Sequence, residues 1–321
     1  MNKPASLELI KAVRLHKSFG PISVLNGIDL TIKAGEVHAI LGENGAGKST
    51  LVKLLSGFEH LSSGSISVQP MNSEDPNDLL KSAVWDQRTA EAQKVILIHQ
   101  ELNLIDELTV AENMFLGVER LTQFSLFGLR FLDRASMDEI ASKYLGVLKI
   151  GISPSDKVGD LSVAEKQLVE IAKALSKNPR VLILDEPTAV LTEQESRVLF
   201  ARIEELKSDG VAIIFISHKL EEIVALADCV TIIRDGDQVG CFNVSELSKD
   251  DMAKLMVGRE LSKLFPSIPE PSSKAEFAMS VSSLEIYGKD PVSFALKRGE
   301  ILGFAGLVGS GRSALMETLV G

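Results

Sequence analysis

The feature that most constrains the fold is a glycine-rich stretch between an apolar run and a helical segment. The apolar run is VHAIL at 37–41, and the stretch is GENGAGKS at 42–49. Glycines allow a tight turn in which several backbone N–H groups point at one anion, and a following helix N-terminus adds positive potential. The order of strand, glycine loop and helix therefore predicts a phosphate-binding loop.

Each part of this loop has an expected role. We expect the Lys48 side chain to reach the β- and γ-phosphates of a nucleotide and the Ser49 hydroxyl to ligate Mg²⁺. A merely flexible glycine turn is the alternative, and the flanking strand and helix argue against it. The candidate nucleotide-binding residues of this segment are Gly42, Glu43, Asn44, Gly45, Ala46, Gly47, Lys48, Ser49 and Thr50.

A second apolar run, VLIL at 181–184, ends in Asp185 and Glu186. Two carboxylates at the tip of a buried strand suit a site in which Asp185 holds Mg²⁺ and Glu186 faces an attacking water. Two acids that end a strand in solvent are the alternative. The glycine loop earlier in the chain favours the functional interpretation.

Composition narrows the possible classes of protein. The net charge of −10 argues against nucleic-acid binding through a broad basic surface. Only Cys229 and Cys241 are present, so no disulfide framework is indicated and a reducing compartment fits. The N-terminus lacks a signal-peptide pattern, and the longest apolar runs are far too short to span a bilayer. Any membrane role is therefore expected to be peripheral.

Strand-like runs alternate with helical stretches, which favours an α/β fold. Residues 136–149 show helical spacing and open with Ser136 and Glu139, a capping-box pattern, and Thr192 with Glu195 predicts another. The pair Asp235-Gly236 between two strand-like runs predicts a hairpin. Residues 261–275 are rich in Pro and Ser and are expected to be a linker.

An internal repeat follows that linker. Residues 30–57 align without gaps to residues 294–321, and the second glycine-rich loop falls in register with the first. Arg312 stands where the first copy has Lys48. One strand, a loop and a short helix cannot bury a core of their own. We therefore expect 276–321 to be the start of a truncated second domain.

Further motifs stand in the order found in ATP-binding cassette (ABC) ATPases, which this sequence resembles over 7–260. They are Phe19 in HKSFG, Gln100 in IHQELNLI, the signature-like segment LSVAEKQ at 161–167 and His218 in FISHKL. The resemblance implies an α/β P-loop NTPase cassette. It would have a RecA-like mixed sheet core, an antiparallel β subdomain and a helical signature subdomain at about 101–178.

The resemblance also implies roles for these residues. Phe19 would stack on adenine, His218 and Gln100 would contact the γ-phosphate and Mg²⁺ or water, and Ser162 would act on nucleotide held by a partner cassette. Plain core positions for Phe19 and His218, and a surface amide at Gln100, remain the alternatives. The resulting catalytic candidates are Glu186, His218 and Gln100, and the metal candidates are Ser49, Gln100 and Asp185. His16, His38, His60 and His99 show no metal-ligand spacing and are expected to be structural.

The signature departs from the common LSGGQ, with Val163, Ala164 and Glu165 in place of Gly, Gly and Gln. A carboxylate near a γ-phosphate is electrostatically unfavourable. A capping box between Ser162 and Glu165 would turn that carboxylate back onto its own helix. The electrostatic penalty and the capping box can both be present.

Within the family the sequence is most similar to the fused double-cassette ATPases of bacterial monosaccharide importers. This implies ATP and Mg²⁺ as cofactors, membrane permease subunits as partners, and a second cassette or homodimer that completes the site. A periplasmic or extracellular sugar-binding protein would be an indirect partner, and no nucleic acid is expected. The protein would lie peripherally on the cytoplasmic face of the inner membrane. The alternatives are a soluble non-transport ABC ATPase and a non-catalytic nucleotide-binding remnant.

Overall fold

The computed structural model describes residues 7–70, 80–81, 85–99, 102–126, 129–149, 151–258, 276–286, 290–306 and 310–320, without the side chains of 80–81 and 123–130. The chain divides into two units, Met1–Leu261 and Ser262–Gly321, and each is considered by itself. The expected linker at 261–275 and the candidate residue Gln100 lie outside the described residues.

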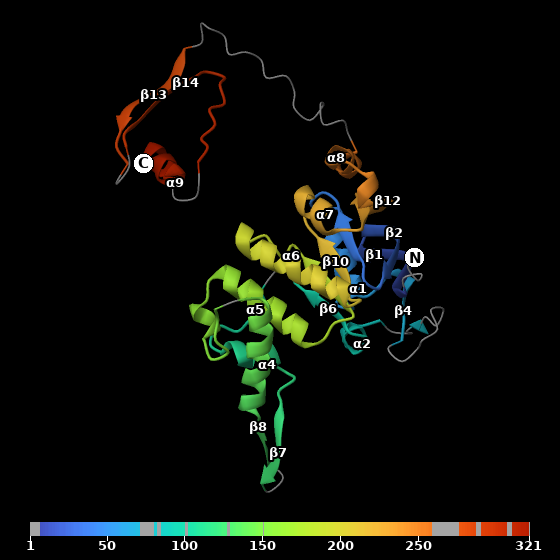
Figure 1. Cartoon of the computed structure of the whole chain (residues 1–321). Coiled ribbons are helices and arrows are strands. Elements are labelled where there is room, and N and C mark those ends of the chain that lie inside the picture. Colours follow the sequence, from blue (N-terminus) through green and yellow to red (C-terminus); the bar gives the residue numbers. More distant parts are fainter. Residues whose placement is uncertain are drawn as a thin grey trace. The chain divides into compact units, whose positions relative to one another are not determined.

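A six-stranded sheet with the strand order β12-β11-β3-β10-β9-β6 forms the centre of the first unit (Figure 1). All neighbouring strands are parallel except the β11–β12 pair. Its strands are β3 (Val37–Leu41), β6 (Val95–Ile98), β9 (Val181–Asp185), β10 (Ala212–Ile216), β11 (Cys229–Arg234) and β12 (Asp237–Asn243).

The central strand β10 shows why this sheet is buried on both faces. Its sequence AIIFI has no polar residue, and all of its residues are buried. Ile213 and Phe215 pack into the core on one face, and Ile214 packs into the core on the other. Complete burial of such a side chain contributes about 1.5–3 kcal/mol. A continuous apolar strand of this kind fits only between two layers.

An antiparallel sheet with the order β2-β1-β4-β5 and helix α1 share one of these two cores. The strands and helices on this side are β1 (Glu8–Phe19), β2 (Ile22–Lys33), β4 (Ser63–Val68), β5 (Leu80–Lys81), α1 (Lys48–Leu55) and α2 (Gln87–Ala92). The only tryptophan, Trp85, is buried here, and its Nε1 donates to the carbonyl of Leu54 at 3.0 Å.

Helices cover the opposite face of the central sheet. The elements on that side are α3 (Val110–Phe115), β7 (Leu121–Leu126), β8 (Leu129–Leu132), α4 (Arg134–Val147), α5 (Val163–Ser176) and α6 (Glu193–Ser208). Next to the β11–β12 hairpin lie α7 (Leu220–Leu226) and α8 (Lys249–Val257). The β7–β8 hairpin projects from the α4–α5 region (Figure 1). The predicted fold class is confirmed by this arrangement of a mixed sheet, an antiparallel sheet and a helical region.

Helix α5 follows from its apolar spacing. Leu168, Ile171, Ala172 and Leu175 recur at three- and four-residue intervals and are all buried against the helical core. The charged residues between them lie on the opposite face, where Lys173 pairs with Glu170 at 3.7 Å.

One predicted helix start was wrong. Helix α4 begins at Arg134 with Asp133 as its N-cap, and the Asp133 carboxylate accepts from the backbone N–H of Ser136 at 3.1 Å. Asp133 takes the capping role three residues before the predicted Ser136, so the helix gains almost one extra turn.

The second unit contains a two-stranded sheet of β13 (Phe277–Leu284) and β14 (Val292–Lys297), and helix α9 (Arg312–Val320). Many of its apolar side chains are exposed, including Phe277 at 64% and Ile301 at 98%. None of the helices in the described part of the chain combines the length and apolarity that a membrane span requires.

Candidate functional site

The pairing of the parallel strands brings the predicted site residues together at one edge of the central sheet. Ile216, the last residue of β10, lies beside Ile40 of β3 on one side and beside Asp185 of β9 on the other. Because these strands are parallel, the segments after them meet at the carboxyl edge of the sheet. The glycine loop, Glu186 and His218 are therefore neighbours in space.

The glycine loop has the backbone that its composition predicts. Gly45 and Gly47 adopt positive φ angles of 85° and 102°, and Gly47 is the N-cap of α1. A Cβ on Gly47 would lie 2.6 Å from Cδ2 of Leu25, and a Cβ on Gly42 would overlap the carbonyl oxygen of Ile233. Only glycine fits both the conformation and the space at Gly47.

Lys48 begins α1 and is buried, with only 7% of its surface exposed. Its Nζ donates to the carbonyl oxygens of Gly42 and Glu43, both at 2.9 Å. Burial lowers the pKa of Lys48, and the nearby carboxylates of Glu186 and Asp185 act in the opposite direction. Two backbone carbonyls of the loop therefore bind the ammonium group, which can exchange these bonds for bonds to an anion.

Asp185 provides buried oxygen ligands beside this lysine. Burial raises the pKa of Asp185 above its ordinary value, the charge of Glu186 raises it further, and a hydrogen bond with Ser49 and the charge of Lys48 oppose that rise. A buried carboxylate and a hydroxyl in contact are the hard oxygen donors that Mg²⁺ prefers. The donor chemistry of Ser49 and Asp185 therefore fits the predicted metal site.

Glu186 and His218 face each other across the edge of the sheet. His218 Nδ1 lies 3.4 Å from Glu186 Oε1. Glu186 has a positive φ of 50°, and its backbone N–H donates to the carbonyl of Ile216 at 3.1 Å. The His218 side chain is 58% exposed, so it is not a buried core histidine.

An open cavity of about 720 Å³ lies over these groups. The glycine loop, the Glu186 carboxylate and the His218 imidazole line one space that is large enough for the phosphates of a nucleotide. The lining residues are Val24, Asn44, Gly45, Gly47, Lys48, Ser49, Thr50, Glu186 and His218.

Several predicted residues do not line this cavity: Gly42, Glu43 and Ala46 of the loop, Asp185 at the end of β9, and also Phe19 and Ser162. Phe19, at the end of β1, is 47% exposed, and its ring lies under the Lys17 ammonium group at 4.6 Å. Val24 of β2, which the sequence analysis did not select, lines the cavity. Ser162 lies at the N-terminus of α5, where it is exposed.

The capping box at the start of α5 is confirmed. The Glu165 carboxylate accepts from the Ser162 backbone N–H and hydroxyl at 2.8 Å each, and Ser162 Oγ accepts from the Glu165 N–H at 3.3 Å. The backbone hydrogen bond from Ser162 is the main cause that lowers the pKa of Glu165. The carboxylate is therefore held against its own helix.

A buried carboxylate that the sequence analysis missed joins two loops of the site. Glu222, on α7, accepts from Thr188 Oγ1 at 2.8 Å and from Ser217 Oγ at 2.6 Å. Thr188 follows Glu186 by two residues, and Ser217 directly precedes His218. Glu222 thereby connects the loop that carries Glu186 with the loop that carries His218.

Comparisons with known proteins agree with this geometry. Residues 25–189 match the ABC transporter family. The chain is 41% identical to the xylose import ATP-binding protein of Photobacterium profundum and 39% identical to the ribose import ATP-binding protein of Halalkalibacterium halodurans. Each match covers 98% of this chain and 60% of the relative, so the chain spans about 60% of the length of these curated relatives.

Solved structures give the same assignment. A nucleotide-free ATP-binding cassette from an ABC transporter matches with a TM-score of 0.64 and 25% identity, covering 78% of this chain and 96% of that one. The fold and the geometry of the loop and the carboxylates agree with the family match at 25–189. Together they show that this chain belongs to the ABC transporter family.

Proposed function

We propose that this chain binds MgATP in the cavity over the glycine loop and hydrolyses it when a second cassette closes the site. The observation that carries the proposal is the convergence of Lys48, Asp185, Glu186 and His218 at one edge of the central sheet. These groups supply a cation, a metal-binding carboxylate, a base and a γ-phosphate contact, which are the parts that phosphoryl transfer to water requires.

In this proposal each residue has one task. Lys48 exchanges its bonds to the loop carbonyls for bonds to phosphate oxygens, and the loop amides hold the same phosphates. Ser49 and Asp185, with Gln100, would hold Mg²⁺, and the ion would neutralise charge that develops on the phosphate oxygens. Glu186 orients the attacking water, and His218 keeps Glu186 in place and contacts the γ-phosphate.

The second half of the site would come from another cassette. The N-terminus of α5 is exposed at Ser162 and Val163, so the N–H groups that the capping box does not engage can face a nucleotide held elsewhere. We infer that 7–260 is one cassette and that 276–321 begins a second. Arg312 starts α9 as Lys48 starts α1. A second cassette of the same chain or a homodimer would bring Ser162 to the partner's nucleotide.

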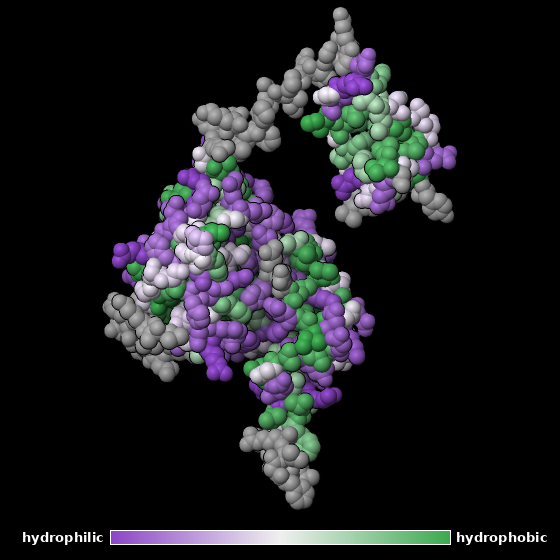
Figure 2. Space-filling view, turned by 180° about the vertical axis from the view of Figure 1, so that it is seen from behind, coloured by the Kyte–Doolittle hydropathy of each residue, from purple (hydrophilic) through white to green (hydrophobic). Residues whose placement is uncertain are grey.

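The import function rests on the relatives, which are named as xylose and ribose import ATP-binding proteins. We propose that this chain energises monosaccharide or polyol import through membrane permease subunits, at the cytoplasmic face of the inner membrane. A sugar-binding protein would be an indirect partner. Hydrophobic side chains gather above the tip of the β7–β8 hairpin (Figure 2), where Leu121, Phe131 and Leu132 are each about half exposed. An exposed apolar patch of this kind suits contact with a membrane protein.

The first test is MgATP turnover by the purified chain over a wide range of protein concentration. We expect a rate per chain that rises with concentration, because two chains complete each site. The Glu186→Gln variant should bind ATP and lose turnover. ATP binding without turnover by the wild-type chain would mean that the second cassette or the permease is required. Absence of ATP binding would refute the proposal, and failure to co-purify with a sugar permease would refute the transport role.

A further inference from the structure

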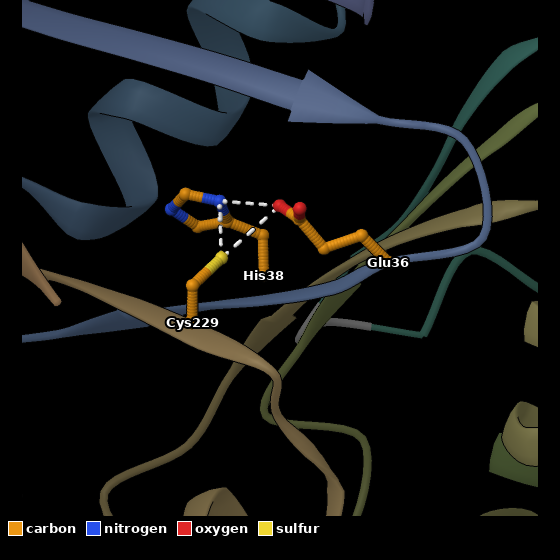
Figure 3. Close-up of side chains that lie close together, drawn as sticks. All are labelled: Glu36, His38 and Cys229. Carbon is orange, nitrogen blue, oxygen red and sulfur yellow. Dashed lines mark hydrogen bonds and ion pairs between the residues drawn. The ribbon is translucent and has the colours of Figure 1, made fainter. Parts of the chain in front are cut away.

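A compact cluster of metal-binding side chains lies outside the proposed nucleotide site. Glu36 directly precedes β3, His38 is the second residue of β3, and Cys229 is the first residue of β11. His38 and Cys229 are direct partners in the parallel β3–β11 ladder, so their side chains lie on the same face of the sheet. Figure 3 shows the three side chains pointing toward one another.

The three ligand atoms are already close to the arrangement that one metal ion would need. Cys229 Sγ lies 3.0 Å from Glu36 Oε1 and 3.1 Å from His38 Nδ1, and His38 Nδ1 lies 3.2 Å from Glu36 Oε1. With tetrahedral Zn²⁺ bond lengths, neighbouring ligand atoms are separated by about 3.3–3.6 Å. A few tenths of an ångström of expansion would admit the ion.

The imidazole of His38 is held in the orientation that metal binding through Nδ1 needs. Only 1% of His38 is exposed, and its other nitrogen, Nε2, lies 2.8 Å from the hydroxyl of Thr231. Metal-binding histidines usually make such a second bond through the nitrogen that does not bind the metal. Thr231 therefore fixes the ring so that Nδ1 faces the carboxylate and the thiol.

A second thiol adjoins the cluster. Cys241 of β12 pairs with Thr231 in the antiparallel β11–β12 hairpin, so it shares the face that carries Cys229. Its side chain lines the same cavity as Glu36, His38, Cys229 and Thr231. Cys241 is exposed and lines a cavity of about 550 Å³ together with the other three side chains, which gives an ion a path from solvent.

We propose that Glu36, His38, Cys229 and Cys241 form a site for a thiophilic metal ion of the Zn²⁺ class. Thiolate and imidazole ligands select such an ion over Mg²⁺ or Ca²⁺, which prefer oxygen. Binding releases the thiol protons to solvent and involves no change of oxidation state. The alternative is a hydrogen-bonded cluster without affinity for metal, and the experiment below distinguishes the two.

The site is separate from the nucleotide cavity. The two cavities share no lining residue in the described part of the chain. His38 and the glycine loop lie toward opposite ends of β3, roughly 13 Å apart at 3.3 Å per residue. A bound ion would join the β11–β12 hairpin to the start of β3, so we expect it to stabilise the fold and to leave ATP affinity unchanged.

Cobalt substitution tests this directly. The full chain, kept under a thiol-free reductant and stripped with a chelator, is titrated with Co²⁺ and then with Zn²⁺ without nucleotide. We expect one ion per chain, a thiolate-to-cobalt charge-transfer band, and loss of that band when Zn²⁺ is added. The chain has only two cysteines, so the band reports on this site alone.

Variants identify the ligands. Cys229→Ser and Cys241→Ser should each weaken Zn²⁺ binding by more than about 100-fold, and Thr231→Val, which removes only the orienting bond, by about 10–100-fold. His60→Gln, at an exposed histidine elsewhere, is the matched control and should bind as the wild type does. Circular dichroism and ATP binding check that each variant folds. Absence of the charge-transfer band, or Zn²⁺ binding that the cysteine variants leave unchanged, would overturn the proposal.

Discussion

Glu222 gives the sharpest stability prediction, because a single buried carboxylate satisfies several donors. It is 8% exposed and accepts from Thr188 and Ser217, which are each only 2% exposed. Its ion pair with Lys219 at 3.1 Å is half open to solvent and contributes little. In Glu222→Ala both hydroxyls lose their acceptor, and each buried unpaired group costs about 1–3 kcal/mol.

We therefore expect Glu222→Ala to lower the free energy of unfolding by about 2–4 kcal/mol, after allowing for the lost cost of burying the carboxylate. Glu222→Gln keeps one carbonyl oxygen, so its loss should be about half as large. Urea unfolding followed by tryptophan fluorescence measures this, because the only tryptophan, Trp85, is buried in the first unit.

Glu221→Gln is the matched control. Glu221 neighbours Glu222 on the same helix but is exposed and pairs with Lys249 at the surface, so the change should stay within about 0.5 kcal/mol. Turnover at 25 °C should also fall about tenfold in Glu222→Ala, a barrier increase of ~1.4 kcal/mol, because the loops of Glu186 and His218 lose their connection. If Glu222→Ala unfolds at the same urea concentration as Glu221→Gln, the hydrogen-bond argument is wrong.

Three further predictions follow from the loop and the signature helix. Gly47→Ala should abolish ATP binding measured with a fluorescent nucleotide, because its Cβ would meet Leu25 at 2.6 Å in a positive-φ conformation; normal binding would contradict this. Lys48→Met should weaken ATP binding about tenfold to a hundredfold, since a charged hydrogen bond contributes about 1.5–3 kcal/mol; unchanged affinity would exclude a phosphate contact. The lowered pKa of Glu165 means that its bond to Ser162 stabilises the fold above the unfolded pKa of about 4.3 and is lost as pH falls through the folded value. The stability gap between wild type and Glu165→Gln, measured by urea unfolding, should therefore shrink from pH 7 to pH 3, and a constant gap would argue against the capping role.

Local sequence signals predicted local structure well. The Asp235-Gly236 pair forms the expected hairpin, with positive φ angles of 52° and 84° at its two central residues. The capping box at Thr192 begins α6 as predicted. Such features depend on a few adjacent residues, so a single sequence is sufficient to find them. The misplaced start of α4 shows the limit, because Asp133 and Ser136 are both good N-caps and only packing selects between them.

Contacts between distant residues were not predictable in the same way. Glu222 and Glu221 are adjacent acids at the start of a helix, and the sequence does not mark which one is buried. His38 and Cys229 are separated by most of the cassette and meet only because β3 and β11 pair in register. No ligand spacing along the chain could signal that cluster, which is why His38 was expected to be structural.

The internal repeat shows how much a strand depends on its neighbours. Residues 37–41 form β3 because β10 and β11 bond to it on both sides. The aligned residues 301–305, which are equally apolar, form no strand, and the sheet that the structure describes in their unit consists of β13 and β14. Helix α9, whose hydrogen bonds are internal, forms at the position equivalent to α1. A helix needs only its own residues for its backbone bonds, whereas a strand needs a partner on at least one side. The repeat therefore reproduces the helix without the strand, whereas β3 of the first copy is held between two parallel neighbours.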